Sequence, residues 1–110
     1  MSYQVVILSK AEEELQQILN WMKDRSPEGA KKWLVAFQQA TELLKHDLLA
    51  RSKAPEDEFV DWEIRQILFK TPRGRRYRTL FTVVDREIRI LHVRGPGQAD
   101  VTPDEISKDE

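Results

Sequence analysis

The stretch "YRTLFTVVDREIRILHVR", residues 77–94, alternates apolar and polar side chains on both sides of the dipeptide Asp85-Arg86. Alternation with a period of two is typical of a strand with one buried face. Two such runs joined by two residues form a β-hairpin. The stretch therefore predicts a hairpin with strands over residues 75–84 and 87–94.

A third strand is predicted just before this hairpin, over residues 63–70. If "TPRG" is a four-residue turn, Leu68 lies opposite Tyr77, and the pleat turns Ile64 and Leu68 toward one face. That face also receives Tyr77, Phe81, Val83, Ile88 and Ile90. The opposite face receives Arg65, Ile67, Phe69, Arg76, Arg78, Leu80, Thr82, Arg89 and Leu91.

The first half of the chain predicts one strand and two helices. "YQVVILS", residues 3–9, is short and β-branched, as in a buried strand. "SKAE" then opens a helix with a capping box at Ser9. Ser26 is the N-cap of a second helix that runs to about Leu49, and the short connection makes the pair an antiparallel hairpin.

The element order predicts an α+β fold, β-αα-βββ, with the helical hairpin packed on one face of a small, mainly antiparallel sheet. That fold occupies residues 1–97 as a single domain, with a loop over residues 50–61. The remainder, residues 98–110, is polar and acidic, and we expect a flexible C-terminal tail there.

Composition excludes several classes of site. The chain has 110 residues, no cysteine and two histidines, so it offers no disulfide, no thiolate nucleophile and little for a metal. No apolar run approaches the roughly 20 residues needed to cross a bilayer. We expect a cytoplasmic protein with no membrane contact, no metal and no cofactor.

Charge is distributed unevenly along the chain. The net charge is −1, yet residues 65–94 hold nine Lys and Arg against two acidic residues. Such a concentration indicates a surface for a polyanion or an acidic partner. The candidate target-binding residues are Arg65, Lys70, Arg73, Arg75, Arg76, Arg78, Arg89 and Arg94.

Two interpretations of these arginines stay open. The pleat brings four of them to the face of the sheet opposite the helices, interleaved with apolar side chains, as a phosphate backbone with stacked bases would require. Alternatively, they are solvated and protect the sheet from aggregation. His92, by contrast, is expected to be a hydrogen-bonded structural residue.

The combination of "AEEELQQILNWMKDRSPEGAKKWLVAFQQATELL", "EIRQILF" and "YRTLFTVVDREIRILHVR" resembles the RelE/ParE superfamily of toxins from type II toxin–antitoxin modules, the plasmid stabilisation proteins. The likeness runs from about Tyr3 to Arg94. It implies a small toxin that is held inactive by a cognate antitoxin. The oligomeric state is open between a homodimer and a toxin–antitoxin hetero-oligomer.

The resemblance implies two kinds of target. RelE-like members cut ribosome-bound mRNA, and Arg78 matches the arginine of their catalytic set, with Arg76 and Arg65 as further candidates only if this chain is a nuclease. The lysines of that set are absent, Arg94 is the nearest match to its last arginine, and no tyrosine follows Tyr77. An arginine alone is a poor general base because it stays protonated.

ParE-like members instead poison DNA gyrase and need no catalytic set, and their long helical hairpin is similar to "EEELQQILNWMKDRSPEGAKKWL". We therefore expect a ParE-like toxin. The alternatives are a RelE-like endonuclease, an inactive relic that still binds antitoxin, and a plain nucleic-acid-binding or structural module.

Overall fold

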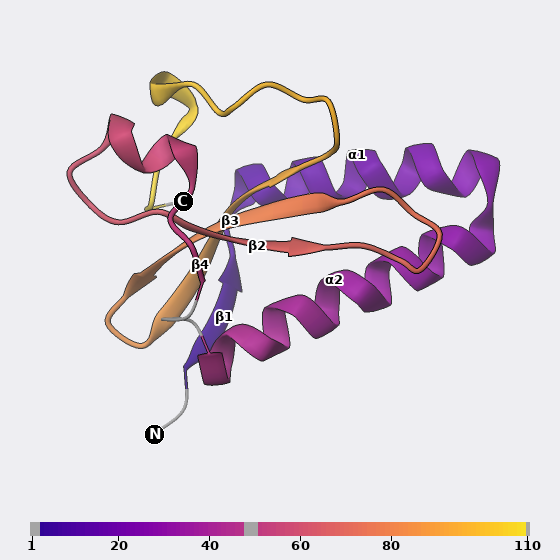
Figure 1. Ribbon diagram of the computed structural model, residues 1–110, viewed down its shortest axis with the longest axis horizontal. Coiled ribbons are helices and arrows are strands. Elements are labelled where there is room, and N and C mark those ends of the chain that lie inside the picture. The colour runs from indigo at the N-terminus through magenta and orange to yellow at the C-terminus, as the bar shows by residue number, and fades with distance from the viewer. Residues whose placement is uncertain (1–2, 48–50, 110) are drawn as a thin grey trace.

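The computed structural model describes residues 3–47 and 51–109 and has the predicted α+β architecture (Figure 1). The elements are β1 (Gln4–Ile7), α1 (Ser9–Arg25), α2 (Pro27–Asp47), β2 (Arg65–Phe69), β3 (Tyr77–Val84) and β4 (Glu87–Arg94), with short 3₁₀ helices η2 (Pro55–Phe59) and η3 (Pro103–Glu105). The predicted end of the second helix near Leu49 lies outside the described residues. No helix in the described ranges is long and apolar enough to cross a membrane.

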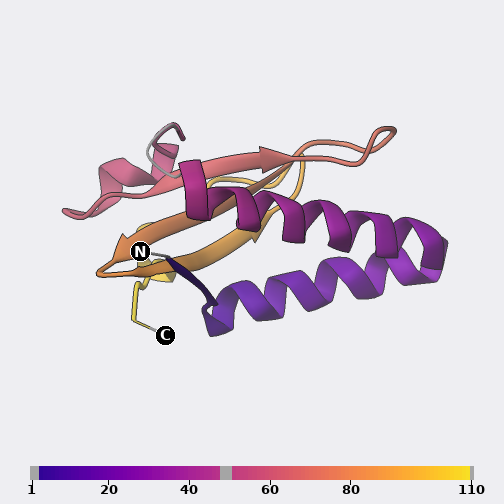
Figure 2. The same cartoon turned by 90° about the horizontal axis from the view of Figure 1, so that it is seen from below.

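The four strands form one sheet in the order β1-β4-β3-β2. Strand β1 runs parallel to β4, and the other neighbouring strands are antiparallel. The hairpin of α1 and α2 forms a second layer on one face of this sheet (Figure 2). The fold class predicted from the sequence is thus confirmed.

Local sequence signals explain one helix start and miss the other. Ser26 caps α2 as predicted, because its Oγ accepts the backbone N–H of Gly29 at 3.0 Å. The capping box expected at Ser9 is wrong: α1 begins one residue earlier, with Leu8 as N-cap. Leu8 is buried in the core, so tertiary packing of its side chain fixes where this helix begins.

An aromatic cluster fills the space between the hairpin and the sheet. Trp33 stacks on Phe37 at a centroid distance of 6.0 Å and lies 5.4 Å from Phe69 and 5.3 Å from Tyr77. Aromatic pairs in these arrangements add to the stabilisation that comes from burying their area. The cluster joins α2 to β2 and to the start of β3.

The predicted register of β2 is wrong by one residue. Tyr77 lies opposite Phe69 rather than Leu68, because the connection between β2 and β3 spans seven residues, 70–76, instead of the four of "TPRG". A slip of one residue exchanges the two faces of a strand. Ile67 and Phe69 are therefore buried under the helices, and Leu68 is 46% exposed.

The face opposite the helices, expected to be open, is covered. Ile64, Leu80 and Leu91 form a second buried cluster there, together with Leu8, Ala54 and Val101. Val101 belongs to the stretch 98–110 that was expected to be a flexible tail, yet its side chain is fully buried. The apolar side chains on this face need cover from water, and η2 and residues 98–109 supply it.

Candidate polyanion-binding surface

Arg78 projects from β3 on the face opposite the helices, as predicted, but it is held in a buried ion pair. Its two terminal nitrogens donate to the carboxylate of Glu56 at 2.9 and 2.6 Å. Gln66 accepts a further hydrogen bond at 3.2 Å, and Asp100 one at 3.1 Å. The Glu56 side chain is fully buried, and it also accepts the backbone N–H of Val101 at 2.9 Å.

The two partners shift each other's pKa toward the charged forms. Burial raises the pKa of Glu56, but the hydrogen bond from Arg78, the hydrogen bond from Val101 N–H and the charge of Arg78 outweigh it, so the pKa lies below the usual 4.5. The hydrogen bond to Glu56 raises the pKa of Arg78 against the effect of its burial. A bidentate pair of this kind fixes η2 to the sheet.

Two further candidate arginines are also engaged in ion pairs. Arg89 lies on this face, but the slip of β2 overturns the prediction for Arg65, which lies opposite Phe81 on the side of the sheet that faces the helices. Arg65 pairs with Glu63 and donates to the carbonyl of Arg51. Arg89 donates to Glu87 at 3.0 Å. It also donates to the carbonyl of Lys108 at 2.6 Å and to Asp109 at 3.4 Å. These arginines attach the covering segments to the sheet instead of facing an open surface.

Arg94 and His92 share a partner on α1. Glu14 accepts the Val93 backbone N–H at 2.9 Å, contacts His92 Nδ1 at 3.1 Å and lies 3.5 Å from Arg94 Nη1. The second ring nitrogen of His92 lies 3.2 Å from the carbonyl oxygen of Glu105. His92 is 1% exposed, so the prediction of a hydrogen-bonded structural histidine is confirmed.

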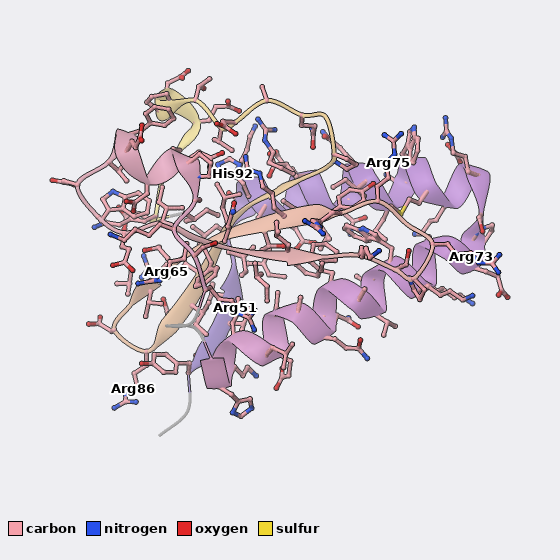
Figure 3. All side chains as sticks on the ribbon, in the orientation of Figure 1. Arg51, Arg65, Arg73, Arg75, Arg86 and His92 are labelled. Atoms are coloured by element: carbon pink, nitrogen blue, oxygen red, sulfur yellow. The ribbon has the colours of Figure 1, made fainter. Side chains whose placement is uncertain are left out.

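The remaining predicted residues, Lys70, Arg73, Arg75 and Arg76, lie on the β2–β3 connection and are exposed. Within residues 3–47 and 51–109, none of these four side chains forms an ion pair. Arg73 and Arg75 point outward at the same end of the molecule as the turn between α1 and α2 (Figure 3). The positive charge available to a partner is therefore on this loop and not on the sheet.

A pocket of about 280 Å³ lies between the loop and the helical turn, and we call it the hairpin-turn pocket. Its lining residues are Trp21, Met22, Arg25, Ser26, Gly29, Trp33, Thr71, Gly74, Arg75 and Tyr77. Three of these carry aromatic rings and two carry guanidinium groups. Aromatic walls beside fixed cations can hold a flat ring that bears a negative charge.

The loop side of this pocket depends on a tight turn. Gly74 donates its N–H to the carbonyl of Thr71 at 3.0 Å. A Cβ at position 74 would collide with Thr71 Oγ1, so a side chain there requires the Thr71 hydroxyl to move. On the helix side, Arg25 lies 3.9 Å from the ring centroid of Trp21 and donates to its carbonyl at 3.1 Å.

The structure divides the predicted residues into two groups. It does not bring Arg65, Arg76 and Arg78 together as one site, because the first and third are engaged in ion pairs and Arg76 lies beside Leu68 at the open edge of β2. It does bring the loop arginines to the helical turn. Sequence reasoning missed the aromatic pocket, because only the tertiary fold places Trp21 beside "TPRGR".

Among the described ranges, no three His, Asp or Glu side chains are grouped so as to hold a metal ion. Comparison with protein-family models finds no match, and neither curated proteins nor solved structures give one. The resemblance to the RelE/ParE superfamily therefore stays a prediction.

Proposed function

We propose that this protein is the toxin component of a type II toxin–antitoxin module and that it acts as ParE-like toxins do, by binding a nucleic-acid-handling target such as DNA gyrase. The observation that carries the choice of binding over cleavage is the buried pair of Arg78 and Glu56. An arginine whose guanidinium already binds a carboxylate at 2.6 Å is not free to stabilise a phosphate in a transition state.

Two other side chains that could act in a nuclease are half-buried (Tyr77) or buried (His92). Tyr77 is the tyrosine closest to the basic loop in sequence, and burial raises its pKa above the usual 10, although the charge of Arg75 lowers it in part. His92 is buried between Glu14 and the carbonyl of Glu105. These side chains support a protein that binds without supplying a general base.

The target contact belongs to the exposed cations of the β2–β3 loop in this proposal. They have no carboxylate partners in the described parts of the chain, so an acidic or polyanionic surface can pair with them without first breaking internal ion pairs. A cognate antitoxin and a cytoplasmic location are parts of the same proposal.

The test is growth of a bacterium on induced expression of the wild type and of Arg73→Ala/Arg75→Ala. We expect the wild type to arrest growth with intact mRNA, a DNA-damage response and stalled gyrase complexes, and the loop variant to arrest growth much less. Arg86→Ala is the matched control, because Arg86 is an exposed arginine in the turn at the other end of the sheet (Figure 3).

The outcomes separate the candidate functions. Cleavage of mRNA inside translated codons would replace the proposal with a RelE-like nuclease. Absence of arrest by the folded wild type would leave an antitoxin-binding relic or a plain binding module. The double variant Glu56→Leu/Arg78→Met should still arrest growth, and a folded double variant without arrest would show that Arg78 acts directly.

A further inference from the structure

The hairpin-turn pocket places aromatic rings, which the proposed function leaves unassigned, beside the loop cations. Trp21 is 54% exposed at its mouth, although it is one of the largest apolar side chains of the protein. Trp33 forms the inner wall, and its indole Nε1 is buried without a hydrogen-bond partner in the part of the chain that the structure describes. Buried indole N–H groups usually have an acceptor, so this donor marks a place where one is missing.

The two chain segments that meet at this pocket are rich in basic residues. Segments 23–32 and 70–76 together carry eight basic residues against two acidic ones, in a protein whose net charge is −1. The basic residues are Lys23, Arg25, Lys31, Lys32, Lys70, Arg73, Arg75 and Arg76. Arg25 lines the pocket from the helical turn and Arg75 from the loop. Lys31, Lys32 and Lys70 line a neighbouring hollow between α2 and the loop. The acidic tail lies near the opposite end of the molecule, beside η2 (Figure 1).

The pocket can hold one flat ring and has a cation on each side, and a nucleotide strand offers a base for the first and phosphates for the second. Each nucleotide presents a flat base and a phosphate, and proteins that bind single strands without sequence preference pair stacking rings with a basic track. The pocket volume of about 280 Å³ is at the small end of ligand sites and leaves room for one base.

We infer that the hairpin-turn pocket receives one base of a single-stranded nucleic acid, with the base against Trp21 and Tyr77 and the flanking phosphates on Arg25, Arg73 and Arg75. This inference does not rest on the toxin proposal, because it concerns binding by the isolated protein.

An acidic peptide is the main competing occupant. It would meet the same cations, but a peptide carries no charge on its backbone and needs acidic side chains at suitable spacing. A strand of nucleotides brings an anion beside every base, so it satisfies cations on both sides of the pocket whatever its sequence. A second copy of this chain could meet these cations only with its acidic tail, because its basic turn would be repelled by them.

The experiment titrates labelled single-stranded RNA and DNA of about 12 nucleotides with the full chain and follows fluorescence anisotropy. Salt is varied between about 50 and 200 mM, and the slope of log K against log salt is recorded. Arg73→Ala/Arg75→Ala should weaken binding at least tenfold at low salt and reduce the magnitude of the slope by about 1.4, the value for two phosphate contacts on a single strand. Arg86→Ala should leave both quantities nearly unchanged.

The aromatic part of the inference is tested by Trp21→Ala, with Phe59→Ala as control because Phe59 is also an exposed aromatic residue, 45% exposed on η2. We expect Trp21→Ala to lower the affinity about tenfold with little change in the salt slope. The indole N–H signals in a nitrogen–proton correlation spectrum give a second measurement. The signals of Trp21 and Trp33 should shift on titration, and that of Trp62 should not.

Parallel titrations identify the source of the ligand. Mononucleotides that shift the same two indole signals as tightly as the oligonucleotides would indicate a free nucleotide. The inference is overturned if Arg86→Ala weakens binding as much as the loop variant, or if only the Trp62 signal moves. It is equally overturned if an acidic peptide with one aromatic residue binds this pocket more tightly than either strand, or if the signals shift with protein concentration alone, as in a dimer.

Discussion

Replacement of Glu56 by alanine tests the central ion pair of the molecule. Glu56 is fully buried, and its carboxylate receives two hydrogen bonds from Arg78 and one from the Val101 N–H. The substitution leaves the guanidinium of Arg78 with Asp100 and Gln66 as its remaining partners. It also removes the contact that joins η2 to the C-terminal segment.

The expected loss of stability follows from the burial of both partners. Removal of one partner of a buried ion pair costs about 3–5 kcal/mol. The Arg78 side chain is 17% exposed and keeps Asp100 at 3.1 Å, so we expect a cost near the lower limit, about 3 kcal/mol. For a domain of this size that corresponds to a decrease in Tm of roughly 10–15 °C.

The pH dependence has a defined sign. The pKa of Glu56 is lower in the folded state than its ordinary value of 4.5, so the pair stabilises the folded protein above about pH 4.5. This stabilisation is lost as the pH falls below 4.5 and through the folded-state pKa. Glu56→Gln cannot be protonated in this way and should lose less stability than the wild type over the same acidic range.

Urea unfolding of the wild type, Glu56→Ala and Glu56→Gln at pH 7 and in steps down to pH 3 measures these differences. Glu58→Ala is the control in the same segment, because Glu58 is exposed, and its effect should be within about 0.5 kcal/mol. A cost below about 1 kcal/mol for Glu56→Ala, together with equal acid sensitivity of wild type and Glu56→Gln, would refute the argument.

Three further substitutions test the packing. Phe69→Ala should lower the free energy of unfolding by about 3–5 kcal/mol in chemical denaturation, and Leu68→Ala by less than about 1 kcal/mol, because the observed register buries Phe69 and exposes Leu68. A larger loss for Leu68→Ala than for Phe69→Ala would support the register predicted from the sequence. Val101→Ala should cost about 1.5–2.5 kcal/mol against nearly nothing for the 49% exposed Val35→Ala, and an equal small effect would mean that the tail does not pack in solution. Glu14→Ala should cost about 1–3 kcal/mol in thermal unfolding, because it leaves a buried backbone N–H of β4 without its acceptor, and a neutral result would contradict that contact.

The hairpin 77–94 illustrates what period-two alternation can predict. Phe81, Ile88 and Ile90 were expected under the helices and are buried there, and the turn at Asp85-Arg86 joins β3 to β4 as expected. The side-chain period and the two-residue turn are local properties, so they are legible in the sequence. The register of β2 was predicted wrongly because it depends on the length of the β2–β3 loop, which is longer than the four residues of "TPRG".

The sequence did not predict that other segments bury the face of the sheet opposite the helices. Leu80 and Leu91 were placed correctly on that face, but the segments that bury them come from residues 51–64 and 98–109, which carry no periodic signal. Their burial depends on single residues, such as Val101, that lie far from their contacts in sequence.

The sequence by itself determined the element order, the α+β class and the concentration of positive charge between residues 65 and 94, because side-chain periodicity and charge are local properties of the chain. Only the tertiary structure decided which of those charges are free. Glu56 reaches Arg78 from 22 residues away, and a buried carboxylate converts a candidate catalytic arginine into a structural one. The same folding leaves Arg73 and Arg75 exposed, with Arg75 in the pocket beside Trp21, because neither arginine meets an acidic side chain within residues 3–47 and 51–109.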